Sequence, residues 1–306
     1  MRVFVTGASG FIGSAVVPEL IGAGHQVIGL ARSDAAADAL THAGAQVHRG
    51  TLTDLDSLRA GAAASDGVIH LAFIHDFSRH REAARTDLCA IETLGAALEG
   101  SGRPLVIASG TLGVSEGRVA TEQDAPGTGS TAGPRAAAAR TTLALAAHGV
   151  RSSVLRLPPS VHGEGDRGLV ASLIATARDK GVSGYVGDGS NRWCAAHRSD
   201  VARLFRLALE GAPAGSVLHG IAEQEVPVHT IAEAIGRHLD LPAVPVSREY
   251  AERHFGWLGV FLGADAPASS ALTRELLGWQ PTHHGLLADL EQGHYFRDDA
   301  SRSTTA

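Results

Sequence analysis

Three glycines near the N-terminus have the spacing of a site that holds a phosphate group. Gly7, Gly10 and Gly13 follow the apolar run VFVT and open a helical pattern. The first glycine permits a tight reversal, the second lets a pyrophosphate approach the backbone amides, and the third lets the helix pack against the strand. The spacing therefore predicts a dinucleotide-binding loop. The residues expected to form it are Gly7, Ser9, Gly10, Phe11, Ile12 and Gly13.

The end of the second apolar run indicates which dinucleotide the loop takes. Proteins that bind NAD in this way place an acidic residue there, which holds the ribose 2′-hydroxyl. This chain has Arg32 followed by Ser33. A guanidinium beside a hydroxyl suits a 2′-phosphate, so we expect NADP(H) to be preferred over NAD(H). The neighbouring Asp34 is the residue that would weaken this preference.

Three polar side chains after later apolar runs are the candidates for catalysis. Ser109 ends the run PLVIAS, Thr111 lies two residues further on, and His75 follows the run around HLAFI. Hydride transfer to a carbonyl or imine needs a hydrogen bond or a proton for the charge that develops on the acceptor atom. We expect Ser109 and Thr111 to polarise that atom, and His75 or an ordered water to donate the proton.

Residues in the second half are expected to face the substrate. They are His162, Trp193 and Arg198, of which Trp193 is expected to serve mainly in packing. The sequence contains no H-E-x-x-H, no clustered Cys/His set and no G-x-S-x-G, and its glycine loop lacks the lysine that a Walker loop requires. No metal site, nucleophile elbow or Walker-type nucleotide site is therefore predicted.

The elements that must position these residues follow from the hydrophobic pattern. Short apolar runs alternate with helical patterns in the first half, which is typical of a doubly wound parallel sheet of the Rossmann type in an α/β fold. The expected strands are 2–6, 26–31, 45–49, 67–72, 104–109 and 151–157. We expect a dinucleotide-binding domain over 1–158 and a smaller substrate-binding lobe over 159–306. Segments of the lobe are expected to return to the sheet.

Composition excludes several classes of protein. The 26 Lys and Arg residues against 32 Asp and Glu residues give a net charge of −6 over 306 residues, so no nucleic-acid partner is expected. No apolar run approaches the roughly 18 residues of a membrane span, and no secretory signal precedes the first strand. The two cysteines, Cys89 and Cys194, form no recognisable motif. A cytoplasmic protein with a small-molecule substrate is the expectation.

Taken in order, the motifs resemble those of the short-chain dehydrogenase/reductase superfamily, in its extended, epimerase-like branch. TGASGFIG at 6–13 is similar to T-G-x-x-G-x-x-G, RLPPSVHG at 156–163 to L-R-x-x-x-V-Y-G, HRSDVA at 197–202 to H-V-x-D-V-A, and LGWQP at 277–281 to L-G-W-x-P. The resemblance implies further cofactor contacts after the third, fourth and sixth strands. These are Thr53, Asp54, Leu55, Leu71, Ala72, Phe73 and Pro158.

One departure from that superfamily bears directly on catalysis. Its members carry Tyr-x-x-x-Lys on the helix after strand five, and the matching stretch at 133–149 reads GPRAAAARTTLALAAHG. Counting back from Arg156 puts Gly133 near the tyrosine position and Ala137 near the lysine position. The chain therefore resembles an atypical member whose proton donor must differ.

These observations favour an NADPH-dependent oxidoreductase that reduces a carbonyl or imine of a small organic substrate. Two alternatives stay open: an NAD(P)-dependent epimerase or dehydratase of a sugar-like substrate, and a non-catalytic NADPH-binding sensor or scaffold. The resemblance also implies a homodimer, because many relatives pair through the helices that correspond to 79–99 and 134–148.

Overall fold

The computed structural model describes residues 1–75, 79–115, 117–125 and 133–297. Its strands are β1 (Arg2–Thr6), β2 (Gln26–Ala31), β3 (Gln46–Arg49), β4 (Gly67–His70), β5 (Pro104–Gly110), β6 (Arg151–Leu157), β7 (Ser160–His162), β8 (Ser183–Val186), β9 (Arg192–His197), β10 (Ser216–His219), β11 (Glu223–Pro227) and β12 (Ala243–Val246). Its α-helices are α1 (Gly13–Gly22), α2 (Asp34–His42), α3 (Leu55–Ala63), α4 (His80–Leu98), α5 (Gly133–Ala144), α6 (Leu169–Lys180), α7 (Arg198–Gly211), α8 (Val228–Leu239), α9 (Ala251–Phe255), α10 (Gly259–Leu262), α11 (Ala271–Leu277) and α12 (Leu286–Glu291). Short 3₁₀ helices cover Leu145–His148, Arg248–Tyr250, Gly256–Leu258 and His294–Phe296.

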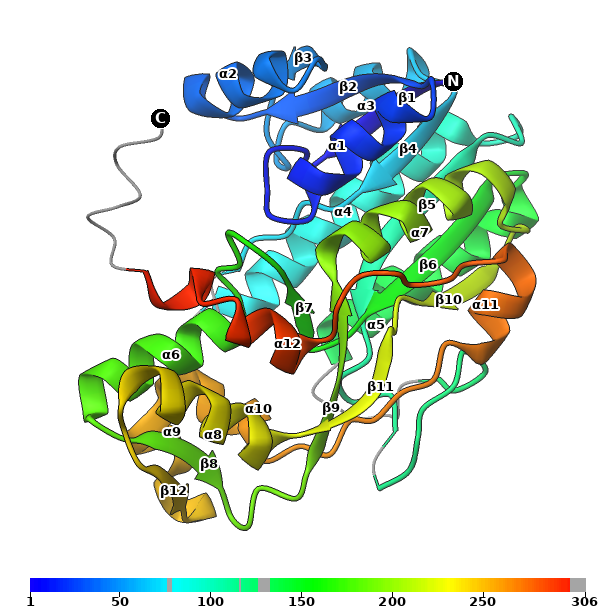
Figure 1. Cartoon of the computed structure of the whole chain (residues 1–306). Coiled ribbons are helices and arrows are strands. Elements are labelled where there is room, and N and C mark those ends of the chain that lie inside the picture. The colour runs from blue at the N-terminus through cyan, green and yellow to red at the C-terminus, as the bar shows by residue number, and fades with distance from the viewer. Residues whose placement is uncertain (76–78, 116, 126–132, 298–306) are drawn as a thin grey trace.

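The large sheet confirms the predicted Rossmann-type fold. Its seven strands are all parallel and run in the order β10-β6-β5-β4-β1-β2-β3 (Figure 1). The chain builds outward from β1 to β3 and then crosses to the other side of β1 to form β4. This reversal of direction is the topological switch point, where sheets of this kind bind ligands beyond the carboxyl ends of the strands.

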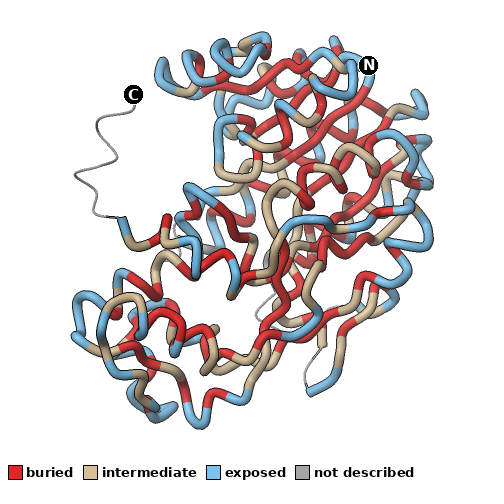
Figure 2. The backbone as a smooth tube through the Cα atoms, in the orientation of Figure 1, coloured by how far each residue is buried: buried red, intermediate tan, exposed pale blue. Residues whose placement is uncertain are grey.

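Helices cover both faces of the sheet, which explains why the strands are continuous apolar runs. Alternate residues of β1 point to opposite faces: Val3 and Val5 pack with α1, α2 and α7, whereas Phe4 packs with α3, α4 and α5. All three side chains are fully buried. Figure 2 shows the resulting band of buried backbone through the middle of the sheet.

The second half of the chain contributes to both parts of the molecule. β10 adds to the large sheet beside β6, and α7 packs against α1. The rest builds a smaller lobe from a three-stranded sheet, β11-β9-β7, and a two-stranded sheet, β12-β8. The lobe has its own core between α6, α8 and these strands. Among the described helices, none combines the length and apolarity that a membrane crossing requires.

We expect the packing of α4 on the sheet to be a major source of stability. Leu94 is fully buried there, whereas Glu92 is exposed two residues earlier on the same helix. Leu94→Ala should lower the free energy of unfolding by about 2–5 kcal/mol, because it leaves a cavity in the core. Glu92→Ala, the matched control, should change it by less than about 0.5 kcal/mol. Denaturant titration measures both, and equal effects would contradict this assignment of the core.

Candidate active site

Each glycine of the N-terminal loop meets a physical requirement. Gly7 has φ +67°, and a Cβ there would lie 2.7 Å from the amide nitrogen of Ala72. A Cβ on Gly13 would lie 2.1 Å from the carbonyl oxygen of Gly7. The amide of Gly10 donates to that same carbonyl over 2.9 Å, which closes the turn. Side chains at Gly7 and Gly13 would therefore push the loop away from β4 and away from the start of α1.

The loop fits a bound pyrophosphate. No side chain caps the N-terminus of α1, which begins at Gly13, so its first amides are free of side-chain acceptors. Ser9 and Gly10 are exposed and Phe11 and Ile12 are half-buried, so the loop presents its backbone to solvent. A helix N-terminus of this kind attracts an anion through its dipole and through backbone amides that no side chain covers.

A buried chain of hydrogen bonds holds β4 next to this loop. The Thr6 hydroxyl lies 2.8 Å from His70 Nδ1, and His70 Nε2 lies 3.1 Å from Asp87 Oδ1 on α4. The amide of Ala72 donates to the Thr6 hydroxyl over 3.3 Å. Thr6, His70 and Asp87 are each at most 2% exposed, so this network is satisfied inside the protein. It fixes the segment expected to lie beside the cofactor, which includes Leu71, Ala72 and Phe73.

The residues expected to meet the adenosine half lie along the outer edge of the sheet. Arg32 is exposed at the end of β2, and Ser33 caps α2 by accepting from the amide of Ala36 over 3.2 Å. Asp34 is paired with Arg49, whose Nη2 lies 2.7 Å from Asp34 Oδ1. The acidic neighbour of Arg32 is thus already balanced by an arginine on β3.

The segment after β3 mixes helix capping with exposed apolar surface. Asp54 caps α3 by accepting from the amide of Ser57 over 3.0 Å, and the Thr53 hydroxyl lies 3.0 Å from that of Thr51. Leu55 is 36% exposed, so its apolar side chain is accessible to the adenine ring that we expect at this edge of the sheet. Pro158, after β6, is buried.

The two hydroxyls proposed for catalysis lie in different surroundings. Ser109 is half-buried at the carboxyl end of β5, paired in register with Arg156 of β6. Thr111 is 2% exposed, and its hydroxyl donates to the carbonyl oxygen of Leu157 over 3.3 Å. The Thr111 hydroxyl is therefore engaged with backbone, and its expected role at the acceptor atom stays a prediction.

Sequence analysis missed a charged residue beside Ser109. Arg135, in the first turn of α5, donates through Nη2 to the carbonyl oxygen of Ala108 over 2.8 Å. Its guanidinium carbon lies 4.2 Å from the centre of the Phe73 ring. Burial lowers the pKa of Arg135, while the charge of Asp87 opposes that shift. The helix that lacks tyrosine and lysine thus carries a fixed positive charge next to the end of β5.

The expectation that His75 donates a proton at neutral pH meets an electrostatic obstacle. Partial removal from water lowers the pKa of His75 below its ordinary value, and the charge of Arg135 lowers it further. The ring lies edge-on to Phe73, with centroids 5.3 Å apart. The imidazolium form is therefore disfavoured at pH 7. Asp76, the carboxylate considered as its relay, lies outside the described residues.

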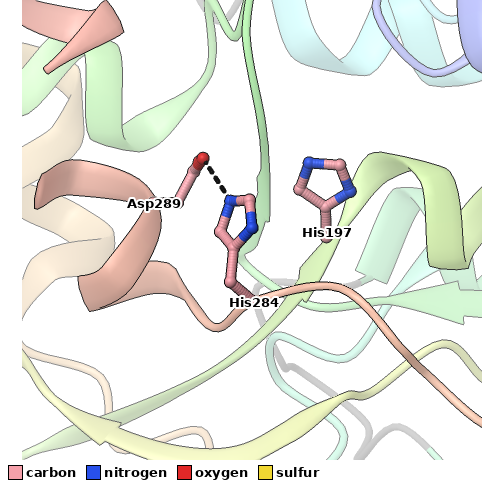
Figure 3. Close-up of side chains that lie close together, drawn as sticks. All are labelled: His197, His284 and Asp289. Atoms are coloured by element: carbon pink, nitrogen blue, oxygen red, sulfur yellow. Dashed lines mark hydrogen bonds and ion pairs between the residues drawn. The ribbon is translucent and has the colours of Figure 1, made fainter. Parts of the chain in front are cut away.

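A second polar centre lies in the smaller lobe, where we define the Asp289 cluster as His162, His197, His284, His294 and Asp289. Oδ1 of Asp289 lies 2.8 Å from His284 Nε2 and 2.9 Å from His294 Nε2, and Oδ2 lies 2.9 Å from His162 Nδ1. Figure 3 shows His197 facing this group from the end of β9. One carboxylate thus organises imidazoles from β7, the segment before α12 and the segment after it.

Charge inside the cluster is unevenly shared. Burial raises the pKa of Asp289, but hydrogen bonds from His162, His294 and His284 outweigh it and hold this pKa well below its ordinary value. The pKa of His197 is lowered to about 4, first by burial and then by the neighbouring His162 and His283. His197 is therefore neutral at pH 7, and its ring stacks on His283 with centroids 4.5 Å apart.

Of the three residues expected to face the substrate, one lines a pocket and two are buried. Arg198 lines a 280 Å³ pocket with His197, His284 and Asp289, and its guanidinium lies 5.3 Å from the centre of the Phe11 ring. His162 and Trp193 are both fully buried. Trp193 packs in the core of the lobe, where it was expected to serve mainly in packing, and His162 is enclosed beside Asp289, so substrate contact by His162 stays a prediction.

Comparison with known proteins assigns this architecture to a family. Residues 3–218, from β1 through β10, match the model of the NAD dependent epimerase/dehydratase family. The chain belongs to that family. The match begins in the strand before the glycine loop and ends in the strand that returns to the large sheet.

Relatives of this epimerase/dehydratase-family protein match along nearly its whole length. An uncharacterized protein of Schizosaccharomyces pombe is 50% identical over 97% of this chain and 100% of its own. A 4-hydroxy-2-methyl-3-oxo-4-farnesyl-3,4-dihydroquinoline-1-oxide ketoreductase of Stigmatella aurantiaca is 28% identical over 96% of this chain and 92% of its own. The structure of MoeE5 in complex with UDP-glucose and NAD superposes with a TM-score of 0.77 and 25% identity, covering all of both chains.

Two glycines of α1 test the loop's geometry. Gly13→Ala should weaken NADPH binding by roughly tenfold or more, about 1.4 kcal/mol, because its Cβ forces the helix away from Gly7. Gly22→Ala, at the other end of α1, meets nothing within 4 Å and should leave binding unchanged. Isothermal titration with NADPH compares the two variants. Equal affinities would mean that this loop does not hold the cofactor.

Proposed function

We propose that this protein is an NADPH-dependent reductase of a carbonyl group, or an imine, on a small organic substrate. The observation that carries the proposal is the Arg135 guanidinium, fixed on the Ala108 carbonyl beside Ser109. The pair lies at the carboxyl end of β5, the edge where ligands bind in open parallel sheets. The 28% identical relative, named a ketoreductase, supports the same class of reaction.

A reduced nicotinamide, when bound, supplies the hydride that goes to the carbonyl carbon. The chain must then stabilise the negative charge that grows on the carbonyl oxygen. Ser109 donates a hydrogen bond to that oxygen, and Arg135 offers a positive charge that is already desolvated and oriented. Because Arg135 is held by Ala108 and Phe73 before substrate arrives, little reorganisation is needed during the reaction.

The proton that completes the alcohol needs a separate source. An arginine does not release its proton in a protein, so Arg135 acts through charge alone. The lowered pKa of His75 leaves little imidazolium at pH 7. We therefore assign the final proton to water, passed through the Ser109 hydroxyl. This replaces the tyrosine that α5 lacks, since Gly133–Ala144 contains neither tyrosine nor lysine.

An epimerase of a sugar-like substrate is the second candidate, favoured by the match to the epimerase/dehydratase family and by the similarity to MoeE5 in complex with UDP-glucose and NAD. Transfer of deuterium from labelled NADPH to a panel of ketones, aldehydes and imines separates the two. A reductase leaves deuterium in a released product and consumes NADPH. An epimerase isomerises its sugar with no net NADPH consumption, and a sensor binds NADPH without either change.

Substitutions at the end of β5 test the assigned roles. Ser109→Ala and Arg135→Gln should each lower kcat by roughly 10²–10³, because each removes a donor or charge from the developing oxyanion. Arg140→Gln is the matched control, an exposed arginine on the same helix, and should leave kcat unchanged. Steady-state kinetics on the substrate found with deuterated NADPH give these values. Full activity in Arg135→Gln would remove it from the mechanism.

The exposed Arg32 should set the choice between cofactors. Arg32→Ala should raise KM for NADPH by roughly 10- to 100-fold while changing KM for NADH little, because a hydrogen bond to a charged group contributes about 1.5–3 kcal/mol. Arg253→Ala, an exposed arginine on α9, is the control. Unchanged discrimination in Arg32→Ala would contradict the preference for NADP(H).

A further inference from the structure

The Asp289 cluster brings together the types of side chain that bind transition metals. His197, His284 and Asp289 each offer one ligand atom, and these atoms lie within 4.8 Å of one another. They come from the end of β9, the segment before α12, and α12 itself. Figure 3 shows the two imidazoles and the carboxylate facing a common space.

We propose that His197, His284 and Asp289 form a binding site for a divalent first-row transition metal ion. Zinc suits this set, because two imidazoles and one carboxylate leave it an open coordination position. Its ligands in a tetrahedral site lie about 3.4 Å apart, given bonds of about 2.0–2.2 Å. Asp289 Oδ1 and His284 Nε2 are 2.8 Å apart and separate by about 0.6 Å when an ion replaces the hydrogen bond between them. The longest separation in the set, at most 4.8 Å, shortens by up to about 1.4 Å.

The surroundings of the three ligands resemble the support that metal sites require. Asp289 is held on both oxygens, by His294 on Oδ1 and by His162 on Oδ2. Such outer hydrogen bonds orient the ligands before an ion arrives.

A second, independent observation is a buried nitrogen atom in the cluster that has no hydrogen-bond partner among the described residues. His162 is fully buried, and its Nε2 has no hydrogen-bond partner among the described residues. Its ring lies edge-on to that of His197, with centroids 5.5 Å apart. A buried polar atom without a partner is rare, and a hydrated ion supplies bonding groups that the protein side chains do not.

The three proposed ligands line a pocket that an ion can enter from solvent. His197, His284 and Asp289 line the 280 Å³ pocket, which Arg198 joins to the glycine loop through Phe11. Nδ1 of His197 accepts from the amide of Ser199 over 3.2 Å and caps α7. Coordination through Nε2 leaves the proton on Nδ1, so metal binding gives up this long hydrogen bond.

Titration of Zn²⁺ into untagged, chelator-treated protein tests the proposal. Wild type should bind one equivalent by isothermal titration, with the same stoichiometry by elemental analysis after dialysis. His197→Asn and His284→Asn should weaken binding at least 100-fold, because each removes a ligand. Asparagine at position 197 keeps a good N-cap for α7 and is too short to reach the ion. His148→Asn controls for surface histidines, since His148 is exposed and remote in the chain.

Two further measurements keep the result interpretable. NADPH affinity without zinc should match wild type in all three variants, and each variant should still unfold in one cooperative transition, which separates lost ligation from lost folding. Co²⁺ should give a visible absorption spectrum in wild type that is absent in His197→Asn. The proposal is overturned if zinc binds without fixed stoichiometry, or equally well in His197→Asn and wild type. In that case the cluster is a set of hydrogen bonds only. Neither outcome depends on the reductase activity proposed above.

Discussion

The close approach of Gly7 to the backbone of Ala72 is the contact on which the rest of the structure depends. It lies at the switch point, where β1 and β4 are neighbours although five helices and strands separate them in the chain. A side chain at this turn would separate the loop from β4. The hydrogen-bonded chain Thr6–His70–Asp87 links β1, β4 and α4 at the same junction. Asp87 also interacts with the charge of Arg135. The glycine loop, β4 and α5 are thereby positioned together.

The alanine-rich composition of α5 has a packing consequence as well as a chemical one. Ala136, Ala138 and Ala139 are buried, so the helix lies close to the sheet and to α4. That proximity is what allows a long side chain in its first turn to fold back onto β5. Arg135 reaches the Ala108 carbonyl from there. The helix contains neither tyrosine nor lysine, and it carries a cation beside the end of the strand.

The Asp289 cluster belongs to the smaller lobe. The match to the family model ends at residue 218, and His284, Asp289 and His294 lie after it in the chain. His162 and Asp289 are 127 residues apart and 2.9 Å from each other. Hydrogen bonds from three imidazoles to Asp289 tie α12 to β7 and to the segments on either side of α12. Residues of this C-terminal segment line the pocket beside Arg198.

Local pattern determined much of this protein. The glycine spacing predicted the loop, because tight turns and close packing exclude side chains at those positions. The apolar runs predicted six strands of the large sheet, because helices on both faces bury most residues of its central strands. Only the tertiary structure decided which polar groups meet. The burial of Thr111 and Trp193, the direction of Arg135 and the gathering of histidines around Asp289 depend on register and on packing between distant segments. Periodicity reports which face of an element is apolar, and it carries no information on what lies across from that face.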